Sequence, residues 1–350
     1  MHFVHDWLPQ RVVFATAGAA GAVAEEVRRL GASRVMAIAS DAGRAAPVLE
    51  GVPVGVLHTE VVMHVPVEVA ERARAVAAEH DVEALVCVGG GSTTGLAKAV
   101  ALTTGLPIVA VPTTYAGSEA TDVWGLTDHG RKTTGSDRQV LPRAVVYDAE
   151  LLLGLPVPTS VASGLNAMAH SVDAMWGPRA DPVDRSLALE GIRGLRVGLP
   201  RVVEDPMDVD GREQTLYGAY LAAVAFASAG SGLHHKICHV LGGMFGLPHA
   251  ETHAVVLSYV LALNGPAVPE LESRIADALG AGAALGGLVS LRDELGAPRS
   301  LRELGMPEDG IPRAAGPIVD AMPANNPAPV TREIVEALLH AAWEGRDPHA

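Results

Sequence analysis

The sequence predicts an α/β domain of the doubly wound type over residues 1–155, followed by an all-α domain over residues 156–350. Two observations predict this division. Short apolar runs alternate with helical patterns up to about residue 155, and no alternating strand pattern recurs after it. A chain of 350 residues also exceeds the usual size of a single hydrophobic core, so two domains are expected.

The first domain holds five apolar runs that we interpret as strands, at Arg11–Phe14, 34–39, 84–88, 107–111 and 144–148. Helices are expected at 20–30, 41–49, Val67–Glu79 and 93–102, and a small hairpin at 124–128 with an Asp-His-Gly turn. Gly31 ends the first helix and Pro66 precedes the third, as these residue types commonly do. The runs at 84–88 and 107–111 are apolar throughout, which is typical of parallel strands buried on both faces.

The second domain reads as helices at 159–176, 183–195, 212–228, Leu233–Phe245, 252–263, 271–279 and 331–344. Glycine and proline separate them, with breaks expected at Gly177, Pro200, Gly265 and Pro298. The small-residue stretch 221–232 predicts close helix packing in a core.

Composition narrows the class of protein. Hydrophobic residues make up 49% of the chain and the mean hydropathy is +0.25, which indicates a well-packed globular protein. A net charge of −14 argues against nucleic acid as a partner. Neither a signal peptide nor an apolar run long enough to span a membrane is visible, so we expect a cytoplasmic protein with no membrane contact. Cys87 and Cys238 are expected to be reduced thiols.

A glycine-rich loop follows the apolar run at 84–88 and leads directly into a helix. Glycines let a backbone approach a ligand, and a helix N-terminus favours phosphate. Thr94 stands where a third glycine would complete G-x-G-x-x-G, and Lys98 does not follow Gly95 as a P-loop requires. The loop after the next strand adds hydroxyls at the same sheet edge, where nucleotides bind in such sheets. The residues concerned are Gly89, Gly90, Gly91 and Ser92 in the first loop and Thr113, Thr114 and Ser118 in the second.

The stretch 232–253 holds five of the chain's fourteen histidines: His234, His235, His239, His249 and His253. His235 and His239 are four residues apart and share one face of a helix, as do Asn166 and His170. Glycine and proline, rather than charged residues, flank the histidines of the stretch 232–253. We therefore interpret the stretch as a functional site rather than a set of structural histidines. The chain's only lysines, Lys98, Lys132 and Lys236, lie in or near these stretches, where they could hold an anionic ligand.

The motifs at 89–99, 111–121, 163–174 and 235–257 resemble the iron-containing alcohol dehydrogenase family, and within it most closely the maleylacetate reductase branch. The segment 329–346 is similar to that branch too, so the resemblance covers nearly the whole chain. It implies a dehydroquinate synthase-like fold, in which an N-terminal NAD(P)-binding domain and a helical domain hold the active site in the cleft between them. It also implies NADH or NADPH as cofactor and a homodimer.

The resemblance further implies metal-ligand positions, an Asp and three His in metal-dependent members. The three histidines match His170, His235 and His249, but Asn166 occupies the Asp position. A neutral amide supplies no charge, so a divalent ion would bind far more weakly. Ala250 and Gly95 also depart from the metal-dependent pattern. We therefore expect a metal-free site.

The implied activity is NAD(P)H-dependent reduction of the C=C bond of maleylacetate, a dicarboxylate, to 3-oxoadipate in aromatic-compound catabolism. Three other functions stay open: a metal-dependent alcohol dehydrogenase, a reductase of a related enone, and a non-catalytic nucleotide-binding protein. The expected catalytic residues are His170, His235, His239 and His249, and the expected substrate-binding residues are Asn166, Lys236, His253 and Tyr115. The expected cofactor-binding residues are Gly89, Gly90, Gly91, Ser92, Thr113, Thr114, Ser118 and Lys132.

Overall fold

The computed structural model describes residues 2–128 and 131–348, apart from the side chains of residues 131 and 132. The chain divides into two compact units. One spans Trp7–Leu155, and the other joins residues 2–6 to the chain from Pro156 onward. His5 connects the first residues to the helical unit, because its Nδ1 lies 2.8 Å from Asp181 Oδ2. The sequence did not reveal this N-terminal connection.

The α/β unit is built on a sheet of six parallel strands in the order β1-β8-β5-β4-β2-β3. The strands are β1 (Arg11–Phe14), β2 (Val35–Ile38), β3 (Val54–His58), β4 (Ala84–Gly89), β5 (Ile108–Pro112) and β8 (Ala144–Tyr147). The five strands expected from apolar runs are confirmed. Strand β3 was missed because it lies at the sheet edge, is largely exposed and contains Gly55, so it has no buried run to detect.

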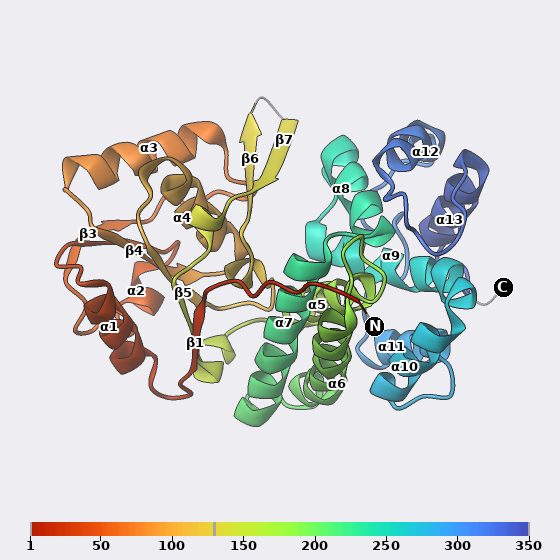
Figure 1. Cartoon of the computed structure of the whole chain (residues 1–350), viewed down its shortest axis with the longest axis horizontal. Coiled ribbons are helices and arrows are strands. Elements are labelled where there is room, and N and C mark those ends of the chain that lie inside the picture. The colour runs from red at the N-terminus through yellow and green to blue at the C-terminus, as the bar shows by residue number, and fades with distance from the viewer. Residues whose placement is uncertain (1, 129–130, 349–350) are drawn as a thin grey trace. The chain divides into compact units, whose positions relative to one another are not determined.

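Helices cover both faces of this sheet. Helix α1 (Ala19–Leu30) packs on one face, while α3 (Val67–Glu79) and α4 (Gly91–Thr104) pack on the other (Figure 1). Helix α2 (Ala42–Ala45) is shorter than the expected 41–49, because Pro47 has no N–H to continue the helical hydrogen bonds. The expected hairpin is present as β6 (Val123–Asp128) and β7 (Arg131–Ser136), although its turn residues His129 and Gly130 lie outside the described residues. Short 3₁₀ turns are η1 (Ser118–Ala120), η2 (Arg138–Val140) and η3 (Ala149–Leu152).

The second unit is helical, as predicted. Its elements are α5 (Val157–Ala174), α6 (Pro182–Glu204), α7 (Val209–Ala229), α8 (Leu233–Phe245), α9 (His249–Asn264), η4 (Gly265–Ala267), α10 (Pro269–Leu279), α11 (Ala284–Glu294), α12 (Gly310–Ala321) and α13 (Arg332–Glu344). Helices α11 and α12 were missed because their glycines and prolines lower helix propensity, which tertiary packing overrides. The break expected at Pro200 was wrong. Helix α6 continues to Glu204, because its packing against α7 outweighs one lost hydrogen bond.

Helices α6 and α7 touch through their backbones. A Cβ added at Gly198 would lie 2.6 Å from Thr215 N, and one at Gly194 would lie 2.9 Å from Gly218 Cα. Contacts this short leave no room for any side chain larger than hydrogen. The two helices therefore pack without an intervening layer of side chains.

A separate core in this unit joins α8 and α9 to α12 and α13 through buried residues such as Leu241, Val256, Ile311 and Leu339. Among the described residues, one stretch is long and apolar enough by composition to cross a membrane, Pro269–Glu294. It consists of α10 and α11, and residues 280–283 interrupt its helical structure.

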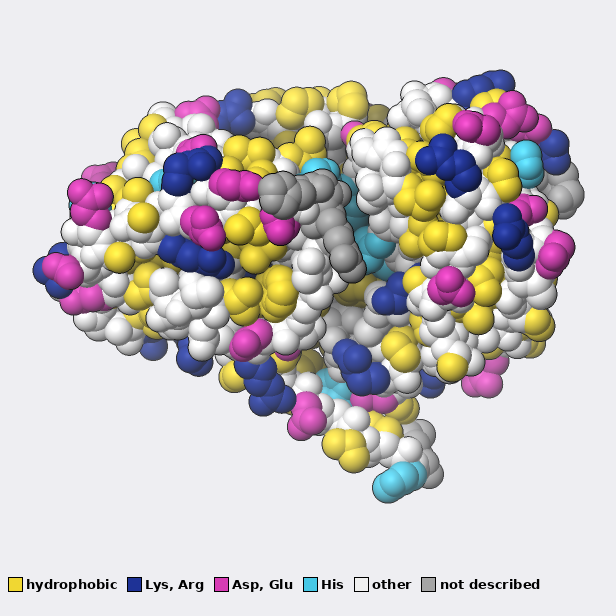
Figure 2. Space-filling model, turned by 90° about the horizontal axis from the view of Figure 1, so that it is seen from above, with side chains coloured by type: hydrophobic (Ala, Val, Ile, Leu, Met, Phe, Trp, Pro, Cys, Tyr) yellow, Lys and Arg dark blue, Asp and Glu magenta, His cyan; other side chains and the backbone are white. Residues whose placement is uncertain are grey.

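On the face shown in Figure 2, Lys and Arg side chains are scattered among Asp and Glu side chains. The described residues of this face thus form no continuous basic stripe of the kind that follows a nucleic-acid backbone.

Candidate active site

Helix α5 carries a buried polar stripe. Asn166, His170 and Asp173 are spaced by four and three residues, which places them on one helix face. All three are buried, although the helix is otherwise formed largely by apolar and small residues. Buried polar groups are costly unless they are paired, so a stripe of this kind indicates a site.

Asp173 caps helix α8 from outside the helix. Its Oδ2 accepts hydrogen bonds from the backbone N–H groups of Gly232 at 3.0 Å and His235 at 3.2 Å. These amides belong to the first turn of a helix that has no cap from its own Gly232. A Cβ at Gly232 would lie 2.5 Å from Asp173 Oδ1, so only glycine allows the carboxylate to approach this closely.

The same carboxylate holds the ring of His235. His235 Nδ1 lies 2.7 Å from Asp173 Oδ2, and both side chains are buried. Burial lowers the pKa of His235 well below its usual value and raises the pKa of Asp173 to about 7, the latter despite backbone N–H groups that lower it. The pair therefore takes up and releases one proton near neutral pH.

His235 Nε2 is buried and has no hydrogen-bond partner among the described residues, so it is the ring atom at which this pair could exchange a proton with a ligand. When the pair holds the proton, Nε2 carries a hydrogen. After its release, Nδ1–H donates to the carboxylate and Nε2 keeps a lone pair. The arrangement can thus act as a general acid or base at one defined atom.

The other histidines surround His235. Its ring centroid lies 5.0 Å from that of His170 and 6.1 Å from that of His239, and Phe226 contacts both His170 and His235. His249 completes the group, with ring centroids 6.2 Å from His239. The structure therefore brings together the four histidines that were expected to be catalytic. His170 and His235 are buried, whereas His239 and His249 are exposed.

His234 and His253 form an inner pair. His234 Nε2 lies 2.8 Å from His253 Nδ1, and both residues are fully buried. Burial lowers the pKa of His234 to about 3 and that of His253 well below its usual value, so both rings are neutral at pH 7. His253 was expected to hold a substrate carboxylate. That role stays a prediction, and the structure shows the ring engaged with another histidine.

A divalent metal would meet only neutral groups at this site. Asn166 Oδ1, His170 Nδ1 and His235 Nε2 are buried without a partner in the part of the chain that the structure describes. The ligating nitrogens of His234, His235 and His253 lie within 4.8 Å of one another. Neither set includes a carboxylate, although three histidines can hold Zn²⁺ when water takes the fourth position, so the trio of His234, His235 and His253 could hold a metal ion. In the first set, the neutral amide of Asn166 supplies no charge, which weakens the affinity of that set for a divalent ion.

The two nucleotide-binding loops predicted in the α/β unit lie side by side. Strands β4 and β5 are adjacent, and Thr113 N donates to Gly89 O at 3.0 Å. A Cβ at Gly90 would lie 2.9 Å from Thr114 Cγ2, so this glycine allows the two loops to touch. The N-cap residue of α4, Gly90, has no side chain to cap the helix, which leaves the first amides of α4 suited to an anion. The loops therefore fit the phosphates of a dinucleotide.

Lys98 holds the second of these loops. Its ammonium is fully buried and donates to the backbone oxygens of Ser118 at 2.6 Å, Thr121 at 2.8 Å and Val123 at 2.8 Å. Burial lowers its pKa to about 7. Lys98 thus positions the loop that carries Ser118 rather than presenting its charge to a ligand.

The remaining expected residues lie in different surroundings. Tyr115 is fully buried inside the α/β unit, and its contact with substrate stays a prediction. The side chain of Lys132 lies outside the described residues. Lys236 faces a cavity in the helical unit. Asp173 was not predicted from the sequence as a site residue. Its position three residues after His170 continues the polar stripe begun by Asn166, so the spacing could have identified it.

Models of two parts of one family match this chain: iron-containing alcohol dehydrogenase over residues 9–149, and the C-terminal part of the Fe-containing alcohol dehydrogenase family over residues 160–343. The chain therefore belongs to the iron-containing alcohol dehydrogenase family. The predicted fold class and the predicted family are confirmed.

Within this family, the chain is similar to proteins named maleylacetate reductase. It is 47% identical to one from Sphingobium indicum and 45% identical to one from Burkholderia cepacia, over 99% and 97% of both chains respectively. A solved maleylacetate reductase from Agrobacterium tumefaciens shares 41% identity with a TM-score of 0.94, covering 99% of this chain and 100% of the other. A structure described as an iron-containing alcohol dehydrogenase from Corynebacterium glutamicum shares 57% identity with a TM-score of 0.98, covering 99% and 98%.

Proposed function

We propose that this chain reduces the C=C bond of maleylacetate with NADH or NADPH, giving 3-oxoadipate, as a step in aromatic-compound catabolism. The observation that carries the proposal is the full-length similarity to several proteins named maleylacetate reductase. The site supports the same chemistry, because it combines a buried proton-exchanging pair with unpartnered buried polar atoms.

The reaction consumes one hydride and one proton. When bound, NADH or NADPH would supply the hydride for the alkene carbon β to the ketone. Negative charge then builds on the ketone oxygen, and the donors that we assign to hold it are the amide Nδ2 of Asn166 and a ring N–H of His170. His235 Nε2 delivers the proton to the α-carbon, and Asp173 hands its own proton to Nδ1 as this occurs. His239 and His249, at the exposed side, are placed to restore the proton from solvent.

The proposed site is metal-free, because an amide occupies the position of the family's Asp ligand. The test is oxidation of NADH and of NADPH with maleylacetate, with and without EDTA, together with metal analysis of the purified protein. We expect turnover that survives the chelator and well under one metal per chain. Stoichiometric metal, with activity abolished by EDTA, would contradict the proposal.

A metal-dependent alcohol dehydrogenase is the second candidate. The similarity to the Corynebacterium glutamicum structure and the persistence of three histidine ligand positions favour it. Oxidation of simple alcohols by the metal-loaded protein, without reduction of maleylacetate, is the result that this candidate requires.

We also propose a cytoplasmic homodimer. Strand β1 lies at an edge of the sheet, where a second copy could pair with it. Light scattering should return about twice the chain mass of 36.1 kDa at micromolar concentration. A mass near that of one chain would contradict this assembly.

A further inference from the structure

A buried group of three side chains lies at the N-terminus of helix α6 and shares no residue with the histidine cluster. One imidazole, His5, faces two carboxylates, Asp181 and Asp184, and one ligand atom from each residue lies within 4.8 Å of the other two. The side chains of His5 and Asp181 are each 7% exposed, and that of Asp184 is 0% exposed. Carboxylates at this depth are rare unless a cation or hydrogen-bond donors compensate their charge.

Helix capping uses only one oxygen of each carboxylate. Asp181 Oδ1 accepts hydrogen bonds from Val183 N at 2.7 Å and Asp184 N at 2.9 Å. Asp184 Oδ2 accepts from Asp181 N at 3.2 Å, which completes a capping box. The other two oxygens, Asp181 Oδ2 and Asp184 Oδ1, both face His5 Nδ1. Capping therefore leaves one oxygen of each carboxylate for a different partner.

The His5 ring satisfies only one of these two oxygens. Its Nδ1 lies 2.8 Å from Asp181 Oδ2 but 3.6 Å from Asp184 Oδ1, and the second distance is too long for a hydrogen bond. Asp184 Oδ1 is buried and accepts no hydrogen bond from the described residues. Burial raises the pKa of Asp184, and the nearby Ser228 hydroxyl and Asp181 amide offset this only in part. A cation shared by the three side chains would compensate this buried oxygen.

The spacing and the chemistry of the three ligand atoms fit Zn²⁺. Bonds of about 2.0–2.2 Å to nitrogen and oxygen place tetrahedral ligand atoms roughly 3.4 Å apart. The distances of 2.8 Å and 3.6 Å from His5 Nδ1 to the two oxygens bracket this value. Two carboxylates match the charge of a divalent ion, and an imidazole favours Zn²⁺ over Mg²⁺ and Ca²⁺, which prefer oxygen ligands.

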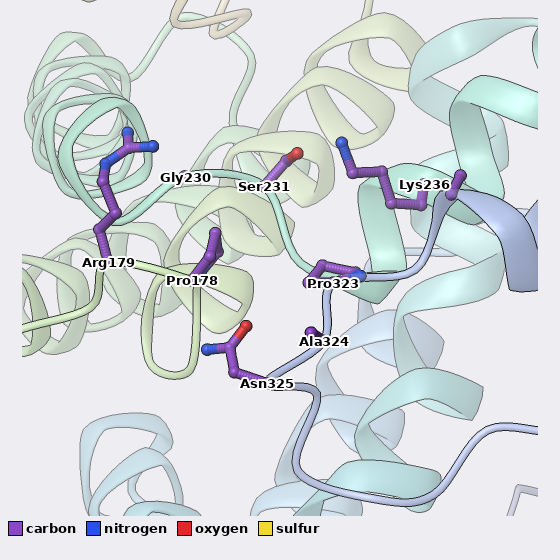
Figure 3. Close-up of a pocket in the computed structure, with 9 residues that line it drawn as sticks. Pro178, Arg179, Gly230, Ser231, Lys236, Pro323, Ala324 and Asn325 are labelled. Carbon is purple, nitrogen blue, oxygen red and sulfur yellow. The ribbon is translucent and has the colours of Figure 1, made fainter.

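The backbone that leads into this site is fixed by its own hydrogen bonds. Arg179 Nε donates to Ser228 O at 2.9 Å and Arg179 Nη2 donates to Ala227 O at 3.0 Å, which fastens the turn before Asp181 to the end of α7. Figure 3 shows Arg179 beside Gly230, the residue that follows α7. Ligands held in place before binding lose less conformational entropy when the ion arrives.

We propose that His5, Asp181 and Asp184 form a structural Zn²⁺ site that fastens the N-terminal residues to helix α6. The ligand atoms are His5 Nδ1, Asp181 Oδ2 and Asp184 Oδ1, and the fourth position is open to water. Residues 2–6 belong to the helical unit, and the chain enters the α/β unit at Trp7. The ion therefore anchors the chain directly before it passes from one unit to the other.

This site is independent of the proposed function, because none of its ligands belongs to the histidine cluster. Zn²⁺ has to displace the hydrogen bond between His5 and Asp181 together with the proton that the bond contains. We therefore expect micromolar affinity, so that protein purified without added zinc retains little of it.

The binding test first removes the histidine cluster as a competing site. His235 belongs to both donor sets of that cluster, so His235→Gln is the background in which the new site is measured. EDTA-treated and dialysed protein is titrated with Zn²⁺ at pH 7 by isothermal titration, and we expect one Zn²⁺ per chain. Adding Asp184→Asn or His5→Gln should weaken binding at least about a hundredfold, because loss of even an outer partner of a ligand costs about 10–100-fold. Mg²⁺ should not compete.

Asp208→Asn in the same background is the matched control, since Asp208 caps α7 through Gly211 N without a histidine partner. It should leave Zn²⁺ affinity unchanged. Affinities within threefold of the background protein after both Asp184→Asn and His5→Gln would overturn the proposal. So would the absence of Zn²⁺ binding to the background protein.

Folding of each variant is checked by its thermal unfolding. If Asp184→Asn does not fold, His5→Gln decides the question. If His235→Gln does not fold, the titration is made in the otherwise unchanged chain, where His5→Gln should remove one Zn²⁺ per chain and an unchanged stoichiometry would refute the site.

X-ray absorption of the zinc-loaded background protein identifies the ligands directly. The spectrum should fit one imidazole nitrogen together with oxygen ligands at about 2.0–2.2 Å. A shell with two or more imidazoles would place the ion elsewhere and contradict the proposal.

Discussion

Replacing Asp173 with Asn is the sharpest perturbation of the proposed proton donor. The change keeps the shape of the side chain and an oxygen that can cap α8, but removes the charge that faces His235 Nδ1 at 2.7 Å. Asn and Asp are nearly equal as helix caps, so the cost to folding is expected to stay within about 1 kcal/mol. The catalytic effect should be much larger.

A hydrogen bond to a charged group contributes about 1.5–3 kcal/mol, equivalent to roughly 10- to 150-fold in rate. General acid catalysis as a whole contributes about 10²–10⁴-fold. We therefore expect kcat for maleylacetate reduction to fall about a hundredfold in Asp173→Asn. Because burial raises the pKa of Asp173 to about 7, wild-type activity should decline above that pH as the pair loses its proton. The variant should lose this limb of the pH profile.

The assay is steady-state NAD(P)H oxidation between about pH 5.5 and 9, the range that brackets this titration. Asp181→Asn is the control, because Asp181 also caps a helix, α6, through Val183 N and Asp184 N. It lies outside the histidine cluster and should change kcat less than threefold. An Asp173→Asn enzyme with wild-type kcat and an unchanged pH profile would refute the role assigned to the pair.

Three further outcomes are expected. Gly90→Val should weaken NAD(P)H binding about tenfold, or about 1.4 kcal/mol, because its side chain would push apart loops that approach within 2.9 Å at Thr114; fluorescence titration measures this. Asn166→Asp restores a carboxylate beside three histidines, so it should gain affinity for Zn²⁺ or Fe²⁺ and lose reductase activity. Buried histidines with lowered pKa values, His170 at about 4 and His234 at about 3 among them, should make the free energy of unfolding fall as pH drops below about 6.5, by roughly 1.4 kcal/mol per pH unit for each. Asp173 opposes this trend with one proton, because its raised pKa means that its contribution to the free energy of unfolding is lost as pH rises. His253→Gln should make the free energy of unfolding, measured by urea unfolding at pH 7 and 5, depend less on pH.

A specific result would contradict each of these three predictions. Unchanged cofactor affinity in folded Gly90→Val would exclude the loops as the phosphate site, and Gly21→Val on α1, whose Cβ would meet nothing within 4 Å, is the matched control. No metal uptake by Asn166→Asp would show that the histidines do not converge as ligands. A His253→Gln variant with the wild-type pH dependence would show that folding does not lower the pKa of this ring.

The sequence predicted those features that depend on local pattern. Continuous apolar runs identified the buried strands β4 and β5, and the glycine loop between β4 and α4 followed from residue type alone. Features that depend on packing between elements could not be predicted from the sequence. Strand β3 forms because β2 offers it hydrogen bonds, and α6 passes through Pro200 because α7 supports it. At the site, histidine spacing identified the cluster. It could not show which ring has a carboxylate partner, because Asp173 and His235 are 62 residues apart.

The side-chain-free contact between α6 and α7 also determines where the chain segments at the ends of these helices lie. Arg179 precedes α6, Gly230 and Ser231 follow α7, and the Arg179 guanidinium donates to the carbonyl oxygens at the end of α7. Glycines in direct backbone contact leave no room for a side chain, so a larger residue at Gly194 or Gly198 would push the helices apart. The segment that joins α12 to α13 is tied to the chain before α6, because Asn325 Nδ2 donates to Gly177 O. A substitution that separates α6 from α7 would therefore also displace this connecting segment, although it is more than a hundred residues away in sequence.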